Sequence, residues 1–145
     1  MNILDENIIE SQRQLLRSWR IRVKQIGHDV GHKGIKDREQ IIPLLQALRR
    51  PVLFTRDLGF FDRRLCHAKY GIVCLAVGAQ DVATFIRRFL RQPAFDTIAV
   101  RMGKVVQVSE TVARMWALGQ PDAIRIDWES YMQHVTESSV RLKKN

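Results

Sequence analysis

Three aspartates lie where their carboxylates could hold a metal ion. Asp5 directly follows a short apolar stretch, Asp57 follows the apolar run VLFT, and Asp37 opens a helical pattern. Two further acids, Glu39 and Asp62, lie close to them in the sequence. Clustered carboxylates suit Mg²⁺ or Mn²⁺, which bind through a few hard oxygen ligands and keep several waters. A metal held in this way can activate water and neutralise the charge of a phosphodiester, so we expect phosphodiester hydrolysis.

Each of these residues has an expected role. Without a cation, crowded carboxylates repel one another and some take up protons, so we expect Asp5, Asp37 and Asp57 to be the metal ligands. Glu39 or Asp62 would then complete the coordination shell or orient a water molecule. Neighbours expected to contact the substrate backbone are Asn7, Thr55 and Arg56.

The apolar pattern of the first half predicts the elements that position the acids. Residues 2–4 are typical of a short buried strand, and apolar residues between 8 and 19 recur at helical spacing. Alternating apolar residues at 21–26 indicate a half-exposed strand. A second helix carries the apolar residues of 41–48, and VLFT at 52–55 is typical of a central strand. The expected N-caps of the two helices are Asn7 and Asp37.

The second half continues the alternation of strands and helices. IVCLAV at 72–77 is an apolar run typical of a strand covered on both faces, and 82–90 is an amphipathic helix. Residues 97–101 and 104–108 are expected to form a hairpin around Gly103, which supplies the positive φ of its turn. This alternation predicts an α/β three-layer sandwich, with a mostly parallel central sheet and helices on both faces.

We expect this α/β domain to occupy residues 1–108, and residues 109–145 to form a C-terminal extension packed on or following it. Ser109 is the expected cap of a short helix that ends at Gly119, and Asp127 is the expected cap of another. No segment is rich enough in Pro, Gly or Ser to act as a linker.

The predicted fold brings the acids to one edge of the sheet. In open α/β sheets, ligands bind beyond the carboxyl ends of the strands, where the strand order reverses. If the strands that precede Asp5 and Asp57 are neighbours, these two carboxylates converge. Asp37 and Glu39 begin a helix on the same side, and Asp62 could reach back over the site. The sequence therefore predicts one acidic site at this edge.

The overall charge favours a polyanionic partner. Lys and Arg outnumber Asp and Glu by 24 to 15, which gives a net charge of +9 and a pI near 10.3. Such a field attracts nucleic acid, an acidic protein or an anionic membrane surface. No apolar stretch reaches the ~20 residues of a membrane span, and the two cysteines are too few for a disulfide framework or a zinc finger. An acidic pair stands where an export signal would be basic, so we expect a cytoplasmic protein without membrane association.

Three segments of the chain are distinctive: LDEN near the start, GIKDREQII in the middle and FTRDLGFF after the central strand. In this order they resemble the PIN-like nuclease domains, and most closely the small single-domain group related to toxin–antitoxin ribonucleases; the resemblance covers residues 2–108. It implies that Asp5, Asp37 or Glu39, and Asp57 are ligands of one or two divalent metals in a ribonuclease site. The chain departs from the family at Gly59, where many relatives carry a second acid.

The function we expect is that of a Mg²⁺- or Mn²⁺-dependent endoribonuclease, the toxin of a toxin–antitoxin pair. RNA would be its substrate and an antitoxin protein its partner, and a homodimer is left open. Because of Gly59, an alternative is a catalytically impaired module that binds RNA or an acidic partner. A third alternative is a receiver-like phospho-acceptor domain, in which Asp57 would be phosphorylated beside a lysine.

Overall fold

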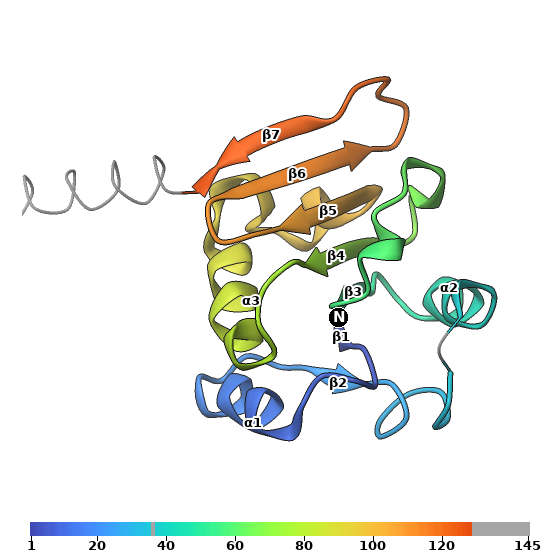
Figure 1. Ribbon diagram of the computed structural model, residues 1–145. Helices are drawn as coiled ribbons and strands as arrows, with labels where there is room; N and C mark the ends of the chain where they lie inside the picture. The colour runs from blue at the N-terminus through green and yellow to red at the C-terminus, as the bar shows by residue number, and fades with distance from the viewer. Residues whose placement is uncertain (36, 129–145) are drawn as a thin grey trace, which may run out of the picture.

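A seven-stranded sheet forms the centre of the computed structural model, which describes residues 1–35 and 37–128 (Figure 1). The strand order is β2-β1-β3-β4-β5-β6-β7; pairing is parallel from β2 through β5, and β6 and β7 are antiparallel additions. The sheet is therefore mostly parallel, as the sequence predicts. The strands are β1 (Asn2–Leu4), β2 (Lys24–Gln25), β3 (Val52–Thr55), β4 (Gly71–Leu75), β5 (Lys104–Val108), β6 (Val112–Ala117) and β7 (Ile124–Asp127).

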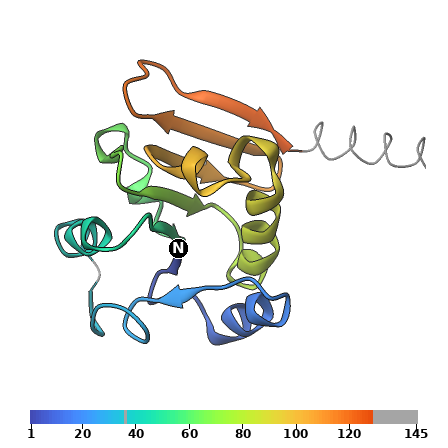
Figure 2. The same ribbon diagram turned by 180° about the vertical axis from the view of Figure 1, so that it is seen from behind.

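Helices cover both faces of the sheet. Helices α1 and α3 lie together on one face and α2 lies on the other, as the two opposite views show (Figures 1 and 2). None of the helices in residues 1–35 and 37–128 is long and apolar enough to cross a bilayer. The helices are α1 (Glu10–Ser18), α2 (Arg38–Ala47), α3 (Val82–Arg91) and α4 (Ile98–Arg101), and the 3₁₀ turns are η1 (Leu58–Phe60), η2 (Arg63–Leu65), η3 (Ala79–Asp81) and η4 (Pro93–Phe95).

The central strands are apolar on both faces because each face has its own core. Along β3, Leu53 packs with the residues of α2, whereas Phe54 packs with those of α1 and α3. Every residue of β3 and β4 is buried, which confirms the two strands predicted from apolar runs. Cys74 of β4 is a buried thiol, and burial raises its pKa to about 12.

The start of the first helix differs from the prediction. Helix α1 begins at Glu10, its N-cap is Ile9, and no side chain caps it. The Ile8 N–H donates to the Asp5 carbonyl (3.1 Å), so residues 5–8 form a turn and Asn7 lies exposed within it. Asp37 does occupy the N-cap position of α2, but its side chain makes no capping hydrogen bond. Both cap predictions therefore fail at the level of the side chain.

The hairpin predicted around Gly103 is only half correct. Lys104–Val108 is a strand and Gly103 has a φ of +78°, but Ile98–Arg101 is the short helix α4. The Thr97 hydroxyl caps this helix by accepting from the Val100 N–H (3.3 Å). Strand β5 already has β4 on one side and β6 on the other, which leaves no place for the predicted partner strand.

Residues 112–117 form strand β6 where the sequence predicts a helix from Ser109 to Gly119, and residues 124–127 form strand β7. Ala113 and Met115 are buried and Arg114 is exposed, which is the period-two pattern of a strand. Strand β6 pairs with β5, and β7 pairs with β6, so this part of the extension completes the same sheet. The helix from Ser109 to Gly119 is therefore wrong, and the helix expected after Asp127 lies outside the described residues.

Candidate acidic site

Asp5 is held rigidly at the carboxyl end of β1. Its backbone N–H donates to the Phe54 carbonyl (3.0 Å), which continues the pairing with β3 by one residue. Its Oδ1 accepts from the Glu6 N–H (2.7 Å) and its Oδ2 accepts from the Thr55 hydroxyl (2.7 Å). Only 8% of the residue is exposed. A buried carboxylate with both oxygens oriented in this way is positioned for a specific role.

Thr55, the last residue of β3, connects Asp5 to Asp57. While its hydroxyl donates to Asp5, it also accepts from the Asp57 N–H (3.0 Å). The Asp57 Oδ1 accepts from the Gly59 N–H (2.9 Å), and Asp57 is otherwise exposed to solvent. Thr55 itself is fully buried, which does not fit its predicted contact with the substrate backbone. Its hydroxyl positions the two acids instead.

Burial and two neighbouring negative charges disfavour the ionised form of Asp5. Burial raises the pKa of Asp5 above its ordinary value, and the negative charges of Asp57 and Glu6 raise it further. The hydrogen bonds from the Thr55 hydroxyl and the Glu6 N–H act in the opposite direction and lower this pKa. A cation between Asp5 and Asp57 would remove both the burial penalty and the repulsion.

A cavity of about 340 Å³ opens between these acids. Its walls are Asp5, Asn7, Ile8, Arg56 and Asp57, all from the segments that follow β1 and β3. The Arg56 Nε donates to the Val77 carbonyl (3.1 Å), which ties this arginine to the segment after β4. Asn7 and Arg56 thus both line the cavity, and their contact with a substrate stays a prediction.

Gln25 supports the site, although no motif in the sequence points to it. It is 1% exposed, and its Nε2 lies within hydrogen-bonding distance of the carbonyls of Asp5 (3.0 Å), Glu6 (3.2 Å) and Ile8 (2.8 Å). Its side chain therefore fixes the turn that carries Asp5. The available signal is its period: Gln25 follows Val23 at an inward position of a half-buried strand, where an amide needs partners.

Glu6 fixes the glycine-rich loop that follows β2. Its two carboxylate oxygens accept from the Gly34 N–H at 3.1 Å and 2.9 Å. Gly27 has a φ of +86°, and a Cβ there would lie 3.2 Å from the Glu6 Oε1, so both geometry and space favour glycine. Glu6 is consequently engaged by the loop, and its charge is still felt at Asp5.

Asp62 is bound by arginines, which contradicts its predicted role at a metal. Its Oδ2 lies 2.8 Å from the Arg38 Nη1 and 2.9 Å from the Arg64 Nη2. Hydrogen bonds from Arg64 and Arg38 hold the pKa of Asp62 well below its usual range. Its oxygens are therefore already satisfied by protein donors. The sequence could not show this, because Arg38 approaches from the start of α2.

Asp37 and Glu39 are exposed at the start of α2 and do not line the cavity. Across residues 1–35 and 37–128, no group of three or more His, Cys, Asp or Glu side chains is arranged to hold a metal ion. The structure thus brings together two of the three predicted ligands, Asp5 and Asp57, and leaves Asp37 apart. The Arg38 side chain contributes to this, since it anchors the start of α2 to Gly59 and Asp62 instead.

The fold and the site define a doubly wound α/β protein with an acidic site at its switch point. The order β2-β1-β3-β4-β5 reverses direction between β1 and β3, and Asp5 and Asp57 follow these two strands. The same order occurs in receiver domains. However, the lysine of β5, Lys104, lies at its amino end, opposite the edge that carries Asp57. The protein-family models, the curated proteins and the solved structures contain no match to this chain.

Proposed function

We propose that the protein is a metal-dependent ribonuclease with the three-layer PIN-like architecture that the sequence resembles. One observation carries the proposal: Asp5 is buried at the switch point of the sheet, and its charge interacts with that of Asp57 across a cavity. Two carboxylates that share a site repel each other, and a cation bound between them would relieve that repulsion. Toxins of this class act on RNA and are restrained by an antitoxin, and the net charge of +9 suits both kinds of partner.

The residues of the cavity fit Mg²⁺ or Mn²⁺. These ions need only one or two protein carboxylates, since waters and substrate phosphate supply the remaining ligands. Asp5 and Asp57 would hold the ion, which supplies water activation and charge neutralisation during attack on the phosphodiester. Thr55 would keep the Asp5 Oδ2 in place, and Asn7 and Arg56 would bind the RNA backbone beside it.

The substitution Asp5→Asn tests the proposal. Asparagine matches aspartate in shape but carries no charge, so we expect Mn²⁺-dependent cleavage of RNA to fall below detection. The melting temperature should stay close to that of the wild type, because removing a buried charge that repels Asp57 offsets the one hydrogen bond that the amide nitrogen of asparagine cannot accept. Cleavage is measured by gel electrophoresis of a labelled single-stranded RNA, with and without EDTA.

Two matched variants complete this experiment. Asp122→Asn removes an exposed carboxylate from the segment between β6 and β7 and should cleave at the wild-type rate. Asp37→Asn should retain most of the activity, because Asp37 does not line the cavity. Equal cleavage by the wild type and the Asp5→Asn variant would exclude the acidic site as the source of activity.

A second candidate function is an RNA- or partner-binding module without catalysis. It is favoured by the capture of Asp62 by Arg38 and Arg64, and by Gly59 at the position of a second acid. Both features reduce the number of acids available for a metal. If RNA is retained in EDTA and no cleavage appears when Mn²⁺ is restored to the wild type, this candidate replaces the ribonuclease.

A further inference from the structure

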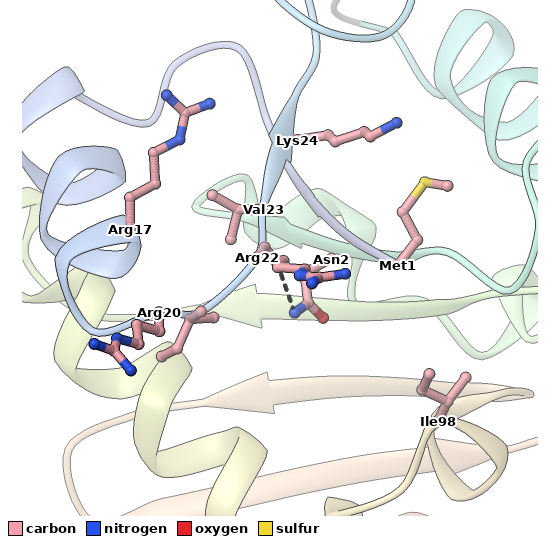
Figure 3. A pocket seen from close by; sticks show the side chains of 9 residues that line it. Met1, Asn2, Arg17, Arg20, Arg22, Val23, Lys24 and Ile98 are labelled. Atoms are coloured by element: carbon pink, nitrogen blue, oxygen red, sulfur yellow. Dashed lines mark hydrogen bonds between the residues drawn. The ribbon is translucent and has the colours of Figure 1, made fainter.

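A second cavity, of about 710 Å³, lies at the edge of the sheet opposite the acidic site. It is lined by residues from the start of β1, the end of α1, the segment that leads into β2, and Ile98 of α4 (Figure 3). The acidic site follows the carboxyl end of β1, whereas this cavity surrounds its amino end at Met1 and Asn2. The two sites are therefore separate, although the same short strand connects them.

The cavity is strongly basic. Four of its residues are cationic (Arg17, Arg20, Arg22 and Lys24), and none of its lining residues is acidic. Arg17 has a distant carboxylate partner, Asp29, at 3.9 Å. The other three have no carboxylate within salt-bridge distance in the part of the chain that the structure describes. Concave surfaces with unneutralised cations concentrate anions.

A further positive charge adds to this edge of the molecule. The N-terminal amine of Met1 donates to the Arg50 carbonyl (3.0 Å) and is partly buried. Burial lowers the pKa of this amine, and the nearby charge of Arg101 lowers it further. The Met1 amine and Arg101 therefore repel each other at this edge of the sheet.

The backbone keeps the side chains of Arg22 and Lys24 in solvent. The two residues alternate with the buried residues Val23 and Gln25 along the free edge strand of the sheet. The turn before them is fixed by Arg20, whose φ is +62°, and by the Ile21 N–H, which donates to the Leu16 carbonyl (3.0 Å). In Figure 3, Lys24 extends away from the strand. Within residues 1–35 and 37–128, neither the Arg22 nor the Lys24 side chain makes a hydrogen bond or ion pair, and it is the Arg22 carbonyl that accepts a hydrogen bond from the Asn2 side chain.

We propose that this basic cavity binds the phosphates of the same single-stranded RNA that enters the acidic site, an inference that rests on the proposed ribonuclease function. The three-residue step from Asn2 to Asp5 spans only ~10 Å at the rise of a strand, so one RNA chain can contact both edges. Arginine and lysine are the usual ligands of phosphate. Ile21 and Ile98 contribute an apolar lining beside these cations.

The variant Arg22→Ala/Lys24→Ala tests this inference. Binding of a 5′-labelled single-stranded RNA is measured by fluorescence polarisation in EDTA, so that cleavage does not interfere. We expect weaker binding, and we expect the slope of log Kobs against log[salt] to become shallower by roughly 1.4, since each phosphate contact of a single strand contributes ~0.7. The matched control, Arg114→Ala/Arg125→Ala, removes two exposed charges from paired positions of β6 and β7 and should keep the wild-type slope.

The outcomes separate this inference from the proposed function. If the wild type cleaves RNA but both double variants share its salt slope, the inference fails and the ribonuclease stands. If the wild type does not cleave RNA, but the slope of log Kobs against log[salt] becomes shallower only in the Arg22→Ala/Lys24→Ala variant, the binding site stands and the ribonuclease fails. If poly-glutamate displaces RNA as well as unlabelled RNA does at equal charge, the cavity binds an acidic protein segment and the RNA assignment is overturned.

Discussion

At the scale of single residues, Thr55 helps to keep the carboxylate of Asp5 ionised. A buried carboxylate tends to take up a proton, and a protonated carboxyl is a poor metal ligand. The Thr55 hydroxyl opposes this by donating to the Asp5 Oδ2 at 2.7 Å. This hydrogen bond and the one from the Glu6 N–H lower the pKa of Asp5, whereas burial and the charges of Asp57 and Glu6 raise it. Thr55 therefore lowers the pH above which Asp5 is ionised.

The substitution Thr55→Val should move the activity profile to higher pH. Valine keeps the shape of threonine but cannot donate, so the already raised pKa of Asp5 should rise further. Metal binding requires the ionised carboxylate, so activity increases as pH rises through this pKa. The acid limb of the rate profile should consequently shift toward higher pH, as measured by initial cleavage rates across the range.

The variant Thr55→Ser is the control for this shift, because serine retains the hydroxyl. It should keep the wild-type limb even if it loses some stability through the missing methyl group. If valine and serine produce the same profile, the hydroxyl has no influence on Asp5 and the positioning role is wrong.

At the scale of elements, the short strand β2 stabilises the turn that carries Asp5. Only Lys24 and Gln25 belong to this strand, and Gln25 contributes the side-chain contacts to the carbonyls of Asp5, Glu6 and Ile8. Its Oε1 has no hydrogen-bond partner among the residues that the structure describes. Gln25 therefore contributes to the turn through its donor group alone.

The substitution Gln25→Leu should therefore destabilise the protein. It removes the donor from three carbonyls, and a buried group that loses its partner costs about 1–3 kcal/mol. The free energy of unfolding from urea titration should fall by this amount, while the exposed Gln46→Leu of α2 should change it little. A Gln25→Leu variant as stable as the wild type would show that the turn does not depend on this amide.

The comparison of sequence with structure shows which elements local patterns can predict. The apolar runs of β3 and β4 and the helix at 82–91 were correctly predicted, since both patterns arise from burial alone. Residues 97–101 and 109–119 were assigned the wrong element, because the identity of their neighbours in the sheet decides between strand and helix. The pairing of β1 with β3 was expected from short crossovers, and it is this pairing that brings Asp5 close to Asp57.

The side chains of the site were harder to predict than its strands. Asp62 and Asp57 both follow β3 and look equivalent as carboxylates, but the approach of Arg38 from α2 captures only Asp62. Gln25 acts through carbonyls 17 to 20 residues earlier in the chain. Contacts of this kind depend on the tertiary packing: the period of the strand indicates that Gln25 points inward, but it does not identify the carbonyls that Gln25 contacts.

At the scale of the whole molecule, the two edges of the sheet carry opposite charges. Acids gather beyond the carboxyl ends of β1 and β3, whereas cations surround the amino ends of β1 and β2. A net charge of +9 attracts a polyanion to the whole surface, but it also repels the cation that we propose for the acidic site. Specific binding of a divalent ion therefore has to overcome the general field, and the buried carboxylate of Asp5 is suited to this.

Mn²⁺ should consequently stabilise the wild-type protein and leave the Asp5→Asn variant unchanged. A ligand at 100 times its dissociation constant adds about 2.7 kcal/mol to the free energy of unfolding, which corresponds to a rise of several degrees in the melting temperature. The stabilisation by Mn²⁺ should depend on pH, because protons compete with the metal for the Asp5 carboxylate. It should grow as the pH rises through the raised pKa of Asp5. Thermal unfolding with and without Mn²⁺ measures it, and the Asp122→Asn variant should respond as the wild type does. An equal response of the Asp5→Asn variant would place the ion elsewhere on the molecule.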